Sequence, residues 1–76
     1  MDLYSVPVID VSRTGAVIGK AIKDSRYSVR DVADYLGTDK ASVYRYIRGS
    51  VLPSTDRLLM LSTLLGVTIN DLLAVA

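Results

Sequence analysis

The chain has 76 residues and a formal net charge of +1, with nine Lys and Arg side chains against eight acidic ones, all of them Asp. This length allows one hydrophobic core and hence one domain, and the 50% content of hydrophobic residues is typical of a folded chain. The near balance of charge excludes a strongly basic coat, so any surface for a polyanion must be local. The chain contains neither Cys nor His, which excludes disulfides, the common zinc sites and Ser-His-Asp triads. We therefore expect no catalytic residues, no metal site and no cofactor, and a binding module rather than an enzyme.

The first residues predict an extended arm and no targeting signal. Residues 1–4 lack the basic region that opens a signal peptide, and no apolar stretch approaches the ~18 residues of a membrane span. Residues 3–9 are rich in β-branched side chains around Pro7, a pattern typical of an extended arm, or of an edge strand at most. We expect an N-terminal arm over residues 1–10 and one helical domain over residues 11–76.

The first helix is predicted from the spacing of Ile18, Ala21 and Ile22, which places three apolar side chains on one face. It is expected to end near Asp24. Three short polar residues could cap its start, and the sequence does not choose among Asp10, Ser12 and Thr14.

The second helix has clear start and stop signals. Ser28 and Asp31 have the spacing of a capping box, in which each side chain accepts a hydrogen bond from the backbone N–H of the other residue. Gly37 is expected to end the helix, because glycine adopts the left-handed conformation of a helix C-terminus at little cost. Asp39 can then cap a third helix over residues 40–48, which Gly49 ends.

The spacing of Ala33, Gly37 and Val43 relates these two helices to each other. A small residue at position 33 allows a close crossing, Gly37 makes the turn, and Val43 fills the space between the helices. This spacing indicates a helix-turn-helix over about residues 28–48, whose second helix has an outer face that can enter a DNA major groove. The same spacing also occurs in helical bundles that bind no DNA.

Two more helices are predicted in the last third of the chain. Ser54 can cap a fourth helix that is rich in leucine and ends at Gly66. Thr68 and Asp71 form a second capping box, which opens a short last helix through Leu73. The expected fold class is therefore all-α.

With these motifs in place, residues 17–73 resemble the Cro/repressor-type helix-turn-helix domain, also called the xenobiotic-response-element type. The resemblance implies a compact five-helix bundle that binds operator-like DNA, usually as a dimer. It depends on the order of caps, turns and short motifs, which are Tyr27–Ala33, Leu36–Gly37, Val43–Tyr46, Arg48–Gly49, Leu52–Ser54 and Leu64–Leu73.

The resemblance also implies which residues contact DNA. It makes the helix at 40–48 the recognition helix, and the residues expected to contact bases are Lys40, Ala41, Tyr44 and Arg45. The residues expected to contact phosphates lie before the second helix, in it, at the end of the third and after it, and are Ser28, Arg30, Arg48 and Ser50. Charge supports this in part, because residues 26–48 hold five basic side chains against three acidic ones, a local net charge of +2.

An apolar surplus predicts self-association. The fourth helix is apolar around most of its circumference, which leaves Leu59 and Met60, together with Val75, without an obvious place in a monomer's core. A well-packed monomer with a few exposed apolar residues is the alternative.

Together these inferences predict a sequence-specific DNA-binding transcriptional regulator. We expect a repressor that binds a pseudo-palindromic operator as a homodimer, in the cytoplasm with the nucleoid of a bacterium or phage host. The expected partners are double-stranded DNA and a second copy, with no membrane and no small-molecule effector. The alternative function is an antitoxin, or an adaptor of a phage or mobile element, that acts mainly through a protein partner.

Overall fold

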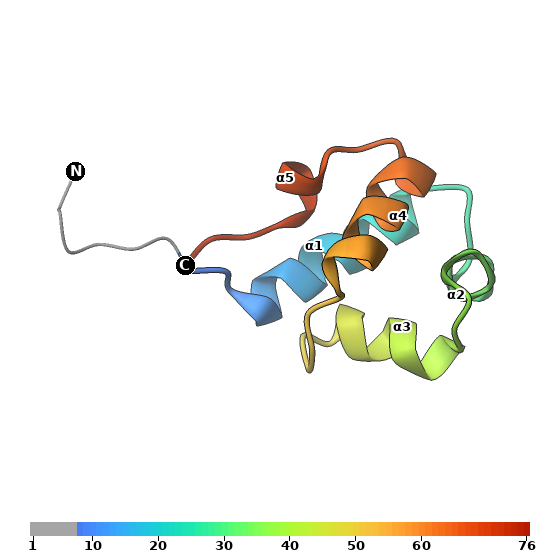
Figure 1. Cartoon of the computed structure of the whole chain (residues 1–76), viewed down its shortest axis with the longest axis horizontal. Coiled ribbons are helices and arrows are strands. Elements are labelled where there is room, and N and C mark those ends of the chain that lie inside the picture. The colour runs from blue at the N-terminus through green and yellow to red at the C-terminus, as the bar shows by residue number, and fades with distance from the viewer. Residues whose placement is uncertain (1–7) are drawn as a thin grey trace, which may run out of the picture.

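The computed structural model of the protein describes residues 8–76, and residues 1–7 of the predicted arm lie outside this part. Helices account for most of it, and the bundle that they form confirms the all-α prediction (Figure 1). The five helices are α1 (Val11–Asp24), α2 (Val29–Leu36), α3 (Lys40–Ile47), α4 (Thr55–Leu65) and α5 (Ile69–Leu72). None of the helices in residues 8–76 is long and apolar enough to cross a membrane.

The start of α1, which the sequence left open, is set by Asp10. Its carboxylate accepts a hydrogen bond from the backbone N–H of Arg13 at 2.9 Å, so Asp10 is the N-cap. Ser12 is exposed in the first turn, and Thr14 is completely buried within the helix. Thr14 is in the core because it lies four residues before the buried Ile18, and residues four apart share one helix face.

The N-caps of the other four helices are those that the sequence predicts. In each helix, the side chain of the N-cap accepts a hydrogen bond from the backbone N–H three residues later, and both predicted capping boxes are complete. The four distances are 3.1 Å at Ser28, 2.8 Å at Asp39, 3.3 Å at Ser54 and 3.1 Å at Thr68. Two helices end one residue earlier than predicted, because Arg48 and Leu73 are the C-caps of α3 and α5.

Each helix contributes to the core at least one large apolar side chain with at most 1% exposure. These side chains are all aliphatic, so the centre of the bundle is packed by the apolar faces that the sequence pattern marks. They are Ile18, Val32, Val43, Leu61 and Leu72.

The two ends of the described chain lie side by side at the end of the molecule opposite α2 (Figure 1). Ile9 and Val75 form an antiparallel β-bridge, flanked by hydrogen bonds of 2.8 Å from the Asp10 N–H to the Ala74 carbonyl and from the Ala76 N–H to the Val8 carbonyl. The described part of the arm is therefore extended, as predicted, and the segment beyond α5 is its strand partner.

Candidate nucleic-acid interface

The turn between α2 and α3 is built around Gly37. Its φ of 71° lies in the left-handed region, where a residue with a Cβ is strained. The N–H of Gly37 donates to the carbonyl of Asp34 at 3.2 Å, and the N–H of Thr38 donates to the carbonyl of Ala33 at 3.0 Å. These two bonds are the Schellman pattern that closes a helix C-terminus and redirects the chain. The turn that joins the predicted helix pair is therefore present.

The inner side of the helix pair is closely packed. Ala33 and Val43 are each 1% exposed, which agrees with the small crossing residue and the filler that the spacing predicts. Tyr46, also on the inner side of α3, is 7% exposed, and its hydroxyl accepts a hydrogen bond of 2.5 Å from the guanidinium of Arg57 on α4. This bond ties α3 to α4. The sequence does not predict this bond, because the two residues belong to different helices and no local pattern links them.

A second support for α3 comes from α1. A Cβ added at Gly15 would lie 2.7 Å from the backbone nitrogen of Gly49 and 2.8 Å from the carbonyl oxygen of Ile47. The backbone of α1 thus touches the backbone at the end of α3, and no side chain fits between them. α3 is therefore held against α1 at its C-terminal end and against α2 at its N-terminal end.

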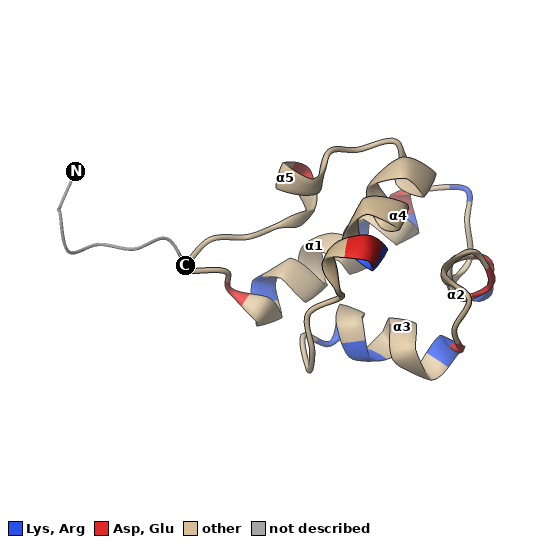
Figure 2. Cartoon of the chain, viewed as in Figure 1, with Lys and Arg blue, Asp and Glu red and all other residues tan. Residues whose placement is uncertain are grey.

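With its inner side packed, α3 presents its other side to solvent. Lys and Arg positions lie at both ends of the helix, with one acidic position beside its first turn (Figure 2). All four residues expected to contact bases are exposed, namely Lys40, Ala41, Tyr44 and Arg45. Tyr44 is 44% exposed and points away from the core, while the Arg45 guanidinium donates to the hydroxyl of Ser42 at 2.9 Å. The outer face of α3 is cationic and aromatic.

The acidic position is Asp39, the N-cap of α3. Hydrogen bonds from Ser42, chiefly from its backbone N–H, and the nearby positive charge of Arg45 lower the pKa of the Asp39 carboxyl. The carboxylate is thus committed to the helix start and remains charged at neutral pH. One negative charge therefore stands beside Lys40 on the outer face.

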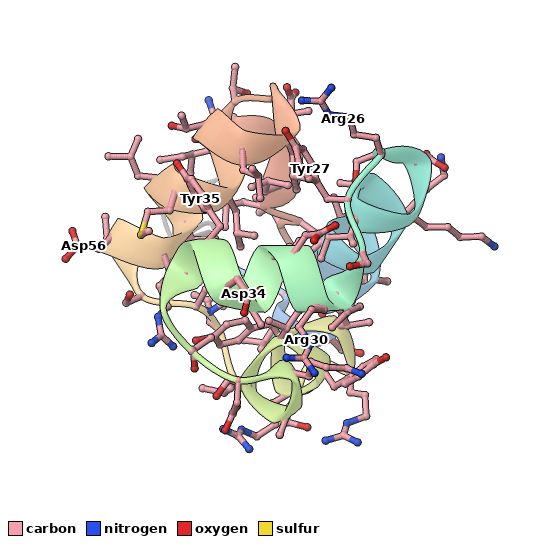
Figure 3. The ribbon with its side chains drawn as sticks, turned by 90° about the vertical axis from the view of Figure 1, so that its right-hand side faces the viewer. Arg26, Tyr27, Arg30, Asp34, Tyr35 and Asp56 are labelled. Atoms are coloured by element: carbon pink, nitrogen blue, oxygen red, sulfur yellow. The ribbon has the colours of Figure 1, made fainter. Side chains whose placement is uncertain are left out.

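Residues expected to contact phosphates lie on both sides of this face. Arg30 lies on the α3 side of α2 (Figure 3), and it lines a shallow hollow together with Thr38, Lys40 and Ala41. The structure thus brings Arg30 next to the N-terminal end of α3. Arg48 and Ser50 are exposed in the segment that follows α3.

Ser28 belongs to a different hollow, at the N-terminus of α2. Its lining includes Lys20 and Lys23 of α1, two cations that the sequence analysis did not connect with DNA. Lys20 forms an ion pair of 2.9 Å with Asp24, whereas Lys23 forms no ion pair within residues 8–76. The sequence does hold a signal that places Lys23 near the N-terminus of α2. Lys23 lies in the last turn of α1, which ends four residues before Ser28.

Arg26 does not share this surface, although it is one of the five basic residues of the 26–48 segment. Figure 3 shows it beside Tyr27, on the α4 side of α2 and away from Arg30. Its guanidinium lies 5.2 Å from the centre of the Tyr27 ring and donates to the Tyr27 hydroxyl at 3.2 Å. Tyr27 itself is half-buried and packs against the core. The predicted local excess of charge is therefore not gathered on one face.

The sequence model of the helix-turn-helix family matches residues 18–72. Among solved structures, the chain is similar to the restriction-modification controller protein C.AhdI from Aeromonas hydrophila, with a TM-score of 0.75 and 24% sequence identity over 83% of this chain and 91% of that one. No curated protein matches the chain. The resemblance that the motifs indicated is thereby confirmed, and the family is one of DNA-binding regulators, not of enzymes. The chain belongs to the Cro/repressor-type helix-turn-helix family.

Proposed function

We propose that the protein is a sequence-specific transcriptional repressor that binds a pseudo-palindromic operator as a homodimer, with α3 in the major groove. The observation that carries the proposal is the division of α3 into two sides. Val43 and Tyr46 are buried against the bundle, whereas Lys40, Tyr44 and Arg45 are exposed on the outside. A helix held in this way can enter a groove without loss of its own packing.

Within this proposal the outer residues of α3 read bases. Lys40 and Arg45 are long cationic donors that suit the O6 and N7 acceptors of guanine. Ala41 offers a methyl group to a thymine methyl, and the hydroxyl of Tyr44 can reach a base edge or a phosphate.

Phosphate contacts then flank the groove. Arg30 stands beside the N-terminal end of α3, and Arg48 and Ser50 follow its C-terminal end, so the two groups suit opposite walls of the groove. At the N-terminus of α2, the hydroxyl of Ser28 and the free N–H groups of the first turn suit a further phosphate, with Lys23 close by.

The homodimer follows from the small number of charges. One domain offers few cations to the phosphates, and Asp39 opposes them, so a single copy binds weakly. Two copies on a two-fold axis place two α3 helices in successive major grooves about 34 Å apart. The proposal places the protein in the cytoplasm, at the nucleoid of a bacterium or phage host. The fold of a controller protein is compatible with such regulation.

The test is a selection of binding sites from randomised duplex DNA, followed by fluorescence titrations of selected and random duplexes at two salt concentrations. The double variant Lys40→Ala/Arg45→Ala is expected to lose the preference for the selected site while it keeps the helical circular dichroism of the native protein. Arg26→Ala is the control, because it removes a cation from the α4 side of α2, and it is expected to keep the preference.

Unchanged selectivity in the double variant would contradict the role of α3. Failure to bind any duplex, together with copurification of a small protein partner, would instead support an antitoxin or adaptor of a phage or mobile element.

A further inference from the structure

The β-bridge at the two ends of the described chain has an open edge at Ile9. The bridge hydrogen bonds are made by Val8, Asp10, Ala74 and Ala76, which flank the central pair. In an antiparallel pair of this type, the N–H and C=O of the central residues point away from the partner strand. The backbone N–H and C=O of Ile9 therefore point outward, and within residues 8–76 neither forms a hydrogen bond.

The opposite edge, at Val75, is bonded to α1 through its carbonyl alone. The carbonyl of Val75 accepts a hydrogen bond of 3.4 Å from the guanidinium of Arg13, whereas the N–H of Val75 forms none within residues 8–76. The N–H of Ala74, on the inner side of the ribbon, donates to the buried hydroxyl of Thr14 at 2.9 Å. These bonds fix the ribbon to the first turns of α1. The Ile9 edge is thus the side on which both a donor and an acceptor are free to pair with another strand.

The ribbon is also apolar where it meets solvent. Val8 is 59% exposed, Ile9 38% and Val75 52%. A ribbon of two very short strands is marginal by itself, and an unpaired apolar edge is a template for a further strand. Val75 is one of the apolar residues that the sequence pattern leaves without a place in a monomer's core. Leu59 and Met60 are the other two. Leu59 is 56% exposed, whereas Met60 packs against the core.

We propose that the Ile9 edge pairs with the Ile9 edge of a second copy, antiparallel and across a two-fold axis, to form a four-stranded ribbon. The same edge on both copies is self-complementary under this symmetry, because each Ile9 offers one donor and one acceptor to the other. Seven residues precede Val8, among them Leu3, Tyr4 and Val6, which are residue types that favour strands. Enough chain is therefore present to lengthen the contact. The inference rests on the homodimer of the proposed function and names its interface.

This interface would also place the two recognition helices. Ile9 is followed directly by Asp10, the N-cap of α1, and α1 contacts the end of α3 at Gly15. The two-fold axis is thus linked to α3 through the first turns of α1, whose backbone packs closely against the end of α3 at Gly15. A dimer made at Ile9 fixes the separation and orientation of the two α3 helices, as recognition of two half-sites requires.

The first test uses the absence of cysteine from the chain. In the variant Ile9→Cys, the two copies would form a hydrogen-bonded antiparallel pair with Cα atoms about 5.5 Å apart, which lies within the range that a disulfide spans. We expect mild oxidation to convert this variant to a covalent dimer. Leu59→Cys is the matched control, because it places a more exposed thiol on α4, the competing apolar face. We expect it to remain largely monomeric in denaturing electrophoresis.

The second test is Ile9→Pro. Proline removes the outward N–H of residue 9 but none of the hydrogen bonds that hold the bridge, and it favours the extended conformation that Val8 already needs. We expect the dimer dissociation constant from sedimentation equilibrium to rise by at least about tenfold. The thermal unfolding of the monomer should not change.

The outcomes separate this inference from the proposed function. Rapid cross-linking of the Leu59→Cys variant but not of the Ile9→Cys variant, a native protein that stays monomeric at all concentrations, or an unchanged dimer in Ile9→Pro would overturn the Ile9 interface. Selective DNA binding in any of these cases would leave the DNA-binding part of the proposed function standing. An Ile9→Cys variant that forms the covalent dimer, in a protein that shows no preference among duplexes, would support the interface and contradict the proposed function.

Discussion

Gly15 of α1 and Gly49 after α3 are in backbone contact, and neither position has room for a side chain. A Cβ at Gly15 would lie 2.7 Å from the Gly49 nitrogen, and a Cβ at Gly49 would lie 2.5 Å from the Cα of Ser12. Real Cβ atoms do not approach backbone atoms so closely, so one of the two helices would have to move. This contact sets how near the end of α3 lies to α1.

Gly15→Ala should therefore destabilise the protein. The atoms that the new methyl group meets belong to the backbone and cannot turn away, so we expect a loss of about 2–3 kcal/mol in the free energy of unfolding, the upper part of the range for overpacking. Urea denaturation followed by circular dichroism measures it. Gly19→Ala is the control, because its Cβ would meet only the side chain of Ile47, with Cγ2 nearest at 2.9 Å, and that side chain can shift. If the two variants were equally stable, α1 and the end of α3 would have to lie farther apart at Gly15 than the contact described above.

Gly37→Ala tests the turn between α2 and α3. A Cβ at this position meets nothing within 4 Å, so the cost comes only from the φ of 71°, about 1–2 kcal/mol. Gly37→Asn should cost less, because asparagine enters the left-handed region more easily. Chemical denaturation of both variants checks the order, and an alanine variant as stable as the native protein would contradict the left-handed turn.

Tyr46→Phe should weaken the tie between α3 and α4. It deletes the hydroxyl that accepts the hydrogen bond from Arg57, for an expected loss of about 1 kcal/mol of unfolding free energy, since Arg57 is half-exposed and can partly turn to water. Tyr44→Phe removes a hydroxyl that makes no hydrogen bond within residues 8–76, and its stability should equal that of the native protein. Similar losses in both variants would show that the Arg57 bond adds nothing.

The capping carboxylates predict a loss of stability in acid. Hydrogen bonds from Ser28 lower the pKa of Asp31, and hydrogen bonds from Ser42 lower that of Asp39. Because both values are lower in the folded chain than in the unfolded one, this stabilisation is complete above the usual Asp pKa of about 4 and is lost as the pH falls through the folded values. Thermal melts over a range from about pH 2 to about pH 6 should show it. Asp39→Asn, which keeps a cap but cannot titrate, should reduce the slope, and an unchanged slope would exclude Asp39 as a source.

Arg48→Ala tests a phosphate contact within the proposed function. If Arg48 neutralises one phosphate, its removal should weaken binding to selected and random duplexes alike and should lower the slope of log affinity against log salt by about one per contact. Titrations of the native protein, Arg48→Ala and Arg26→Ala over a range of salt concentrations provide the measurement. A slope that falls equally in both variants would point to net charge rather than to a contact at Arg48.

The helices and their order could be predicted from the sequence, because the interactions that start and stop them are local. Ser28 and Asp31 complete their capping box three residues apart, and Gly37 and Gly49 end helices through their own backbone conformation. The small residue at Ala33 and the filler at Val43 indicated the helix pair for the same reason. The exposure of the predicted base-contacting residues followed from this pattern, since a buried face on α3 leaves the opposite face outside.

Contacts between distant segments were decided only by the tertiary structure. Asp10 rather than Ser12 or Thr14 caps α1, because Thr14 is needed in the core beside Ala74, some 60 positions along the chain. The bond from Arg57 to Tyr46 and the pairing of Ile9 with Val75 likewise join segments that no periodicity relates. Hydrogen bonds within a turn need only neighbouring residues, whereas these contacts exist only after packing has brought separate helices and both ends of the chain together.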